Sequence, residues 1–190
     1  MSLLEIEGLT HSFGENLLYK NAGFTLNRGE HIGIVGQNGT GKSTLIKICT
    51  EQIIPDSGRI VWQPNTTIGY LDQYAEIDHT LTMKEFLKSA FTKLFEMEAQ
   101  ALQLYEKAAD GDMKSLELAA RYQEQLEAHD FYSIDTAIDR VANGLGLLAI
   151  GLDRPIAEMS GGQRAKVILA KLLLEKPDVL LLDEPTNFLD

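Results

Sequence analysis

Eight residues in the first quarter of the chain have the types and spacing of a phosphate-binding loop. Residues 36–43 read GQNGTGKS and fit the pattern G-x-x-x-x-G-K-[ST] at every fixed position. Glycines allow the backbone to wrap around a phosphate chain with its N–H groups turned inward, and a helix start behind the loop adds partial positive charge. In such a loop Lys42 reaches the β- and γ-phosphates and the Ser43 hydroxyl ligates Mg²⁺. The run predicts a site for a nucleoside triphosphate.

A second chemical feature is a pair of acids near the end of the chain. Asp183 and Glu184 directly follow residues 179–182, a continuous apolar run typical of a strand buried in a parallel sheet. Ligands of open α/β sheets bind at the carboxyl ends of such strands. One acid there can hold Mg²⁺, and the other can position and polarise the attacking water molecule.

Small residues also precede an expected helix in the last quarter of the chain. Residues 160–163 read SGGQ, and the helix that follows is expected over residues 164–176, ending at Pro177. Small side chains at a helix start leave backbone N–H groups open to an anion.

The elements that position the phosphate loop are short. Residues 31–35 read as a buried strand before the loop, and residues 44–49 read as a helix start after it. Phe13 lies upstream and could stack on a nucleotide base, although an aromatic residue in a strand more often belongs to a core. Further strands are expected at residues 4–7, 23–26, 59–62 and 67–71.

The middle of the chain has a helical pattern. From about residue 82 to 109 apolar side chains recur at helical spacing, and Thr82 with Glu85 forms a capping-box start. Two more helices are expected over about 113–128 and, capped by Ser133, to about residue 143. A first helix of about 28 residues would be about 42 Å long, which exceeds the needs of a compact core. A protruding helical hairpin and a plain subdomain packed on the core both fit this pattern.

Composition narrows the functional classes. The 190-residue chain has a formal net charge of −11, which argues against a general nucleic-acid-binding surface and against sequence-specific DNA binding. Its single cysteine, Cys49, excludes a disulfide framework and indicates a reducing compartment. The first residues carry acids where a signal peptide carries bases, and no apolar run approaches a membrane span. A cytoplasmic protein without membrane contact is expected.

Four segments together resemble an ATP-binding cassette (ABC) ATPase. Residues 36–43 look like its Walker A loop, Gln73 like its Q-loop, residues 160–163 like its signature motif and residues 180–185 like its Walker B motif. Met159 stands where the family usually has Leu, a conservative departure.

This resemblance implies ATP and Mg²⁺ as ligands and a role for each matching residue. The implied catalytic residues are Glu184 and Gln73, and the implied metal ligands are Ser43, Gln73 and Asp183. The implied nucleotide contacts are Phe13, Gly36, Asn38, Gly39, Gly41, Lys42, Ser43, Thr44, Ser160, Gly161, Gly162 and Gln163.

Within this family the chain is similar to the ABC-F subfamily of soluble translation factors. Residues 183–190 read DEPTNFLD and resemble that subfamily's D-E-P-T-N-H-L-D, with Phe188 in place of the commoner His and Asp190 at the D-loop position. The helical stretch after Gln73 resembles the arm inserted in the first of two ABC-F cassettes. The resemblance implies the ribosome and a second cassette, in the same chain or in a dimer, as partners.

The expected fold is α/β: a P-loop ABC-type nucleotide-binding domain with an N-terminal antiparallel β subdomain and an inserted helical arm or subdomain. We expect residues 1–75 to form the β subdomain and P-loop core, 76–150 the helical subdomain with an arm-like hairpin, and 151–190 the signature helix and Walker B strand. In the family a further strand lies between the strand before the loop and the Walker B strand. The resemblance therefore implies a C-terminally truncated cassette, in which residues 32–35 and 179–182 lack the neighbour between them.

Three functions remain open at this point. Asn187 and the length of the helical insert favour ATP hydrolysis as one cassette of a translation factor on the ribosome. The alternative is the ATP-binding subunit of an ABC membrane transporter. A third reading is nucleotide binding alone, because the signature of one ABC cassette completes the site of another and an isolated cassette is expected to be inactive. The acid-rich helical stretch suits a ribosomal protein better than rRNA.

Overall fold

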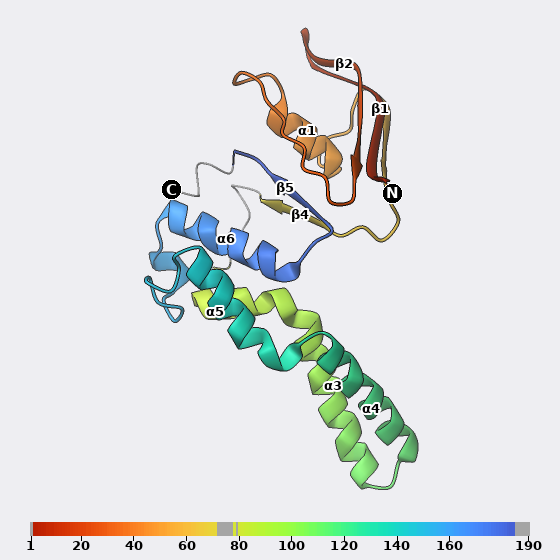
Figure 1. The fold of residues 1–190 in the computed structure, drawn as a ribbon, viewed down its shortest axis with the longest axis vertical. Coiled ribbons are helices and arrows are strands. Elements are labelled where there is room, and N and C mark those ends of the chain that lie inside the picture. The colour runs from red at the N-terminus through yellow and green to blue at the C-terminus, as the bar shows by residue number, and fades with distance from the viewer. Residues whose placement is uncertain (1, 72–77, 79, 185–190) are drawn as a thin grey trace. The chain divides into compact units, whose positions relative to one another are not determined.

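The computed structural model describes residues 2–71, 78 and 80–184 of the chain. Gln73, Phe188 and Asp190 therefore lie outside the described residues. The chain divides into two compact units, which we call the sheet unit (2–71 with 177–184) and the helical unit (78 with 80–176). The elements, shown in Figure 1, are β1 Ser2–Phe13, β2 Asn16–Asn27, α1 Lys42–Cys49, β3 Ser57–Trp62, β4 Ile68–Leu71, α2 Met83–Lys88, the 3₁₀ helix η1 Ser89–Phe91, α3 Thr92–Ala109, α4 Met113–Ala128, η2 Phe131–Ser133, α5 Ile134–Gly144, η3 Ile156–Glu158, α6 Gly161–Glu175 and β5 Val179–Leu182.

The sheet unit is built on β1, which pairs antiparallel with β2 on one side and β3 on the other. Leu4, Ile6 and Leu9 of β1 are buried, and they share a core cluster with Ile48 and Cys49 of α1. This packing confirms the expected antiparallel β subdomain and fixes the phosphate-loop helix on it. Burial in the same cluster raises the pKa of the Cys49 thiol to about 11.

A parallel pair, β4 with β5, carries the two acids. The ladder runs from Ile68 opposite Val179 to Leu71 opposite Leu182. Asp178, just before β5, accepts hydrogen bonds from the Thr67 N–H (3.1 Å) and the Thr67 hydroxyl (2.9 Å). These bonds, with the Arg28 guanidinium at 3.1 Å, hold the pKa of Asp178 below its usual value. Asp178, the residue before β5, thus pins the start of this strand beside Thr67.

The expected strand over residues 31–35 does not form. Residues 31–37, all of them described, have no regular secondary structure, and Val35 is 94% exposed. A strand needs a neighbour for its backbone N–H and C=O groups, and no described strand pairs with this segment. Ile32, Ile34 and Leu180 instead line a cavity of about 470 Å³ in the sheet unit.

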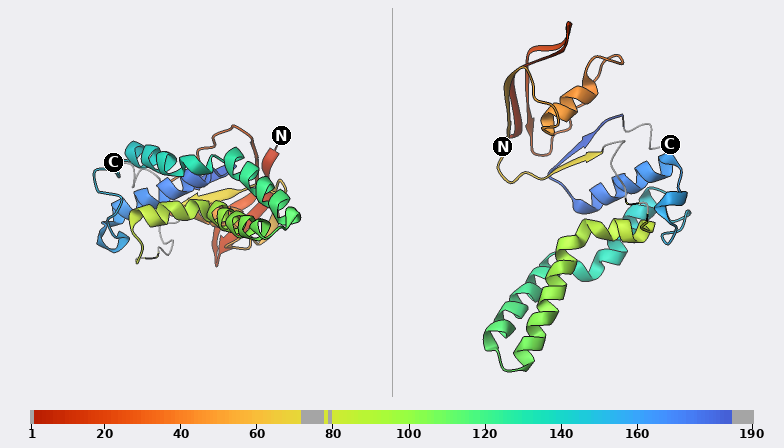
Figure 2. Two further views of the ribbon diagram at one scale, coloured as in Figure 1. Left: turned by 90° about the horizontal axis from the view of Figure 1, so that it is seen from below. Right: turned by 180° about the vertical axis from the view of Figure 1, so that it is seen from behind.

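The helical unit has a core and an extended hairpin. Leu87 of α2, Ile138 of α5 and Val167 of α6 are fully buried in the core. In Figures 1 and 2, α3 and α4 lie side by side and extend away from the rest of this unit. The protruding hairpin is therefore the arrangement found, and α4 has the bounds expected from its pattern. Among the described helices, none is both long and apolar enough to cross a membrane.

The single long helix expected from 82 to 109 is interrupted. The capping box of Thr82 and Glu85 is confirmed, but α2 ends after six residues and a 3₁₀ turn separates it from α3. The Ser89 hydroxyl donates to the Phe86 carbonyl at 2.6 Å, a local bond that competes with the helical ladder. The expected cap of α5 also differs, because the Ser133 side chain makes no capping hydrogen bond within the described residues.

The approach of β3 to β1 at Gly58 gives a stability prediction. Gly58 has a φ of +107°, and an added Cβ would lie 2.7 Å from the Leu9 N and Cα atoms. Gly29, in the same unit, has a φ of +80° with nothing within 4 Å of an added Cβ, and it is the matched control. We expect Gly29→Ala to cost about 1–2 kcal/mol of the free energy of unfolding and Gly58→Ala to cost about 1–3 kcal/mol more because of the added clash.

Urea unfolding followed through Trp62 measures this difference, because the chain's only tryptophan lies in β3. Equal losses in the two variants would contradict the close approach of these strands.

Candidate functional site

The end of the phosphate loop is also the start of a helix. α1 begins at Lys42, and the N-cap Gly41 has a φ of 99° and a ψ of 7°, in the left-handed region. Gly39 also has a positive φ, of 85°. Gly41 has no side chain with which to cap α1, so the first N–H groups of the helix are available to an anion.

The Lys42 side chain folds back over the loop. Its Nζ donates hydrogen bonds to the carbonyl oxygens of Gly36 and Gln37, each at 3.0 Å. The Thr40 hydroxyl donates to the same Gln37 carbonyl at 2.9 Å. The loop therefore holds an ammonium group beside a helix N-terminus, and both favour a bound anion.

A pocket of about 270 Å³ opens at this loop, close to the lower limit of about 300 Å³ for typical ligand sites. Its lining includes eight predicted site residues, namely Phe13, Asn38, Gly39, Gly41, Lys42, Ser43, Thr44 and Glu184. Phe13 is 53% exposed at the end of β1, so part of its ring is accessible to a ligand. Asn16 and Leu18 of β2 also line the pocket, and neither is among the residues predicted from the sequence.

The two acids after β5 have different positions. Glu184 lies in the pocket lining with Lys42 and Ser43, whereas Asp183 precedes it and is not in the lining. The backbone turns sharply at Glu184, where φ is 46°. Within the described residues, no three His, Cys, Asp or Glu side chains are grouped as a metal site. A hydroxyl and one carboxylate do fit Mg²⁺, because this ion is usually held by few protein groups together with substrate phosphates.

The predicted signature residues lie in the helical unit. Ser160 is the N-cap residue of α6, and its hydroxyl accepts from the Gln163 N–H at 3.2 Å. The Gln163 side chain in turn accepts from the Ser160 N–H at 2.9 Å. This capping box starts the helix three residues earlier than expected. The N–H groups of Gly161 and Gly162 remain outside the box.

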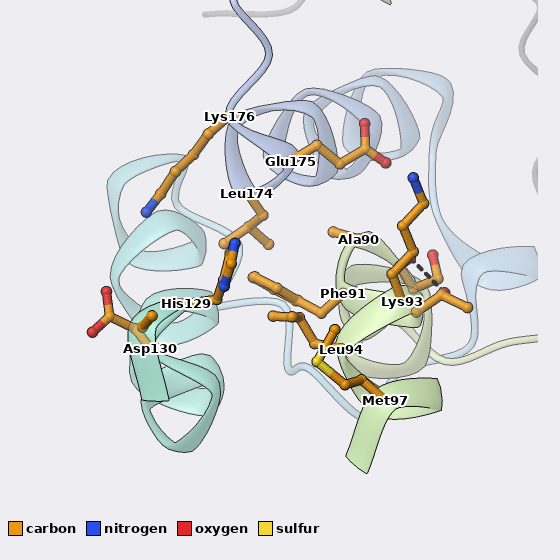
Figure 3. Close-up of a pocket in the computed structure, with 13 residues that line it drawn as sticks. Ala90, Phe91, Lys93, Leu94, Met97, His129, Asp130, Leu174, Glu175 and Lys176 are labelled. Carbon is orange, nitrogen blue, oxygen red and sulfur yellow. Dashed lines mark hydrogen bonds between the residues drawn. The ribbon is translucent and has the colours of Figure 1, made fainter. Parts of the chain in front are cut away.

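A further cavity, of about 750 Å³, lies in the helical unit (Figure 3). Phe91, Leu94 and Met97 form an apolar wall, and His129 and Lys176 lie across from it. None of the residues recorded in its lining is a predicted site residue. We assign the cavity no part in the phosphate chemistry.

Tyr19, a further residue beside the loop, was also not predicted as a site residue. The Tyr19 hydroxyl, from β2, donates a hydrogen bond to the carbonyl oxygen of Gly41. Burial raises the pKa of Tyr19, so the phenol remains a donor at neutral pH. A tyrosine in an alternating strand looks like a core residue, and no sequence signal distinguishes this one.

Comparisons with known proteins relate the whole chain to ATP-binding cassettes. The family described as ABC transporter matches residues 19–187. The "Uncharacterized ABC transporter ATP-binding protein YfmM" of Bacillus subtilis (strain 168) is 46% identical, and the match covers 100% of this chain and 38% of that protein.

Two further relatives carry more specific names. "ABC transporter F family member 5" of Arabidopsis thaliana is 34% identical over 98% of this chain and 28% of its own length. "Energy-dependent translational throttle protein EttA" of Escherichia coli (strain K12) is 38% identical over 91% of this chain and 31% of its own length. The chain spans about a third of the length of these curated relatives.

A solved structure confirms the cassette fold. The "Structure of ATP binding subunit of ABC transporter" matches with a TM-score of 0.68 at 23% sequence identity, covering 100% of this chain and 69% of that chain. At this identity the likeness concerns the fold alone.

Replacing Lys42 tests the phosphate-loop assignment. Lys42→Ala removes a charged phosphate contact from a loop built around it, and we expect binding of Mg-ATP to fall below detection in titration calorimetry. Lys47→Ala is the matched control, since Lys47 lies in the last turn of the same helix and is not in the pocket lining. Near-normal affinity in Lys42→Ala would contradict the assignment.

Proposed function

Because the chain belongs to the ABC transporter family, whose cassettes bind and hydrolyse ATP, we propose that the pocket at the phosphate loop is its ATP site. Bound Mg-ATP would supply the γ-phosphoryl group that is transferred to water. The loop N–H groups and the Lys42 ammonium hold the phosphate chain, and the Phe13 ring stacks on the base. The observation that carries this proposal is the lining itself, which joins a base-sized aromatic face, an ammonium, a hydroxyl and a carboxylate in one pocket.

The metal and the water are assigned to the acidic end of the pocket. Ser43, Asp183 and Gln73 would hold Mg²⁺, and Glu184 would orient the attacking water and accept its proton. Support for Glu184 as the acid that orients the water comes from the pocket, whose lining contains Glu184 but not Asp183. A carboxylate that already binds the metal is a weaker base, so separate acids suit the two tasks.

A second cassette completes the reaction in this proposal. The N-terminus of α6, with Gly161 and Gly162, contacts the γ-phosphate of a nucleotide bound to the other cassette. Support comes from the capping box, which stiffens this helix start through Ser160 and Gln163 while leaving the two glycine N–H groups outside it. An isolated cassette is accordingly inactive.

The cellular role we propose is that of a cytoplasmic translation factor on the ribosome. It is supported by relatives named as an F family member and as a translational throttle protein, and by the α3–α4 hairpin. This hairpin, residues 92–130, carries nine acidic and four basic side chains, and Leu102 and Met113 on it are exposed. Such a surface suits a basic ribosomal protein better than the phosphates of rRNA.

Replacing Glu184 separates binding from chemistry. Glu184→Gln keeps the shape of the side chain but removes the base, so we expect Mg-ATP binding to survive. Phosphate release by the protein paired with its second cassette should fall at least about 100-fold. Turnover that barely changes would exclude Glu184 as the base.

The same variant tests the ribosomal role. With ATP present, Glu184→Gln should co-sediment with ribosomes because the bound state persists, whereas Lys42→Ala, which cannot hold ATP, should remain in the supernatant. Binding of the same variants to membrane fractions, prepared from the cells that supply the ribosomes, is measured in parallel. Association with membranes instead of ribosomes would favour the transporter alternative.

A further inference from the structure

We propose that Tyr19 is a positioning residue that sets the orientation of the peptide between Gly41 and Lys42, and through it the affinity of the loop for a polyphosphate. This inference rests on the proposed function of the pocket. It assigns a role to a β2 residue outside the phosphate-loop motif.

Two donors converge on one carbonyl oxygen. The Gly41 oxygen accepts the Leu45 N–H at 2.9 Å, which is the first hydrogen bond of α1, and it also accepts the Tyr19 hydroxyl. The first donor belongs to the helix itself, but the second comes from a strand of the antiparallel sheet. The hydroxyl therefore ties the end of the loop to the antiparallel sheet.

Because the peptide bond is planar, the hydrogen bond from Tyr19 to the Gly41 carbonyl also fixes the direction of the Lys42 N–H. In a trans peptide the C=O and the following N–H point in opposite directions. Holding the Gly41 carbonyl toward Tyr19 and Leu45 therefore turns the Lys42 N–H away from them. That N–H is among the first of α1, the groups that an anion binds at a helix start.

The close contact between loop and strand supports the same role. An added Cβ on Gly41 would lie 2.6 Å from the Tyr19 hydroxyl oxygen and 3.2 Å from Leu18 Cδ1. Leu18 itself lines the pocket. The Tyr19 hydroxyl thus holds Gly41 by a hydrogen bond, and Tyr19 and Leu18 together leave no room for a side chain at this position.

Tyr19→Phe deletes the hydroxyl and keeps the ring that packs against the core cluster. Affinities of the intact protein for Mg-ATP and for magnesium tripolyphosphate are measured by calorimetry. We expect both to weaken by the same factor, about three- to tenfold, as for one neutral hydrogen bond. The ratio of the two affinities, which reports the contribution of the base and sugar, should not change.

Two further variants serve as controls for the affinities measured with Tyr19→Phe. Phe13→Ala should weaken ATP binding and leave tripolyphosphate binding nearly unchanged, so it changes the ratio. Tyr105→Phe makes the same chemical deletion on α3 and should alter neither affinity.

The outcomes separate the two claims. If wild type binds both ligands and Tyr19→Phe matches it, the inference about Tyr19 is wrong and the proposed function stands. A change in the ratio rather than a common factor would also overturn it, because the effect would then lie at the base. If wild type binds neither ligand, the proposed function is wrong and the inference falls with it.

Discussion

The left-handed backbone at Gly41 is the constraint that joins the parts of the sheet unit. One residue ends the phosphate loop, starts α1 and packs against β2. A side chain there would collide with Tyr19, and the φ of 99° is one that residues other than glycine rarely adopt. The loop therefore depends on glycine for two reasons at once, backbone conformation and close packing.

The other elements of the sheet unit hold this loop and the residues around it in position. β1 and β2 provide the surface on which α1 rests, through Leu4, Ile6 and Ile48. The β4–β5 pair, pinned by Asp178 and Thr67, brings Glu184 to the pocket at the loop. The chemistry of the proposed site thus comes from short loops, and the strands that hold them contribute position rather than reactive groups.

Much of this could be predicted from the sequence because the signals are local. The glycine spacing, the capping box of Thr82 and Glu85, and the apolar run before Asp183 each specify a conformation with neighbours a few residues away. The break at Ser89–Phe91 was missed because apolar periodicity continues through it, whereas the Ser89 hydroxyl bonds locally to the Phe86 carbonyl. Tyr19 was missed because its role depends on Gly41, which lies 22 residues further along the chain.

Segment 31–37 shows that an apolar sequence pattern does not form a strand unless a neighbouring strand pairs with it. It has a strand-like sequence, but no described strand offers it a ladder. This unpaired segment affects how readily molecules of the chain associate with one another. A segment that has no strand partner among the described residues, with Val35 exposed, offers unpaired backbone groups for pairing between molecules. The net charge of −11 opposes such contacts by mutual repulsion. Salt screens that repulsion without weakening the apolar attraction, so self-association of the chain is favoured as ionic strength rises.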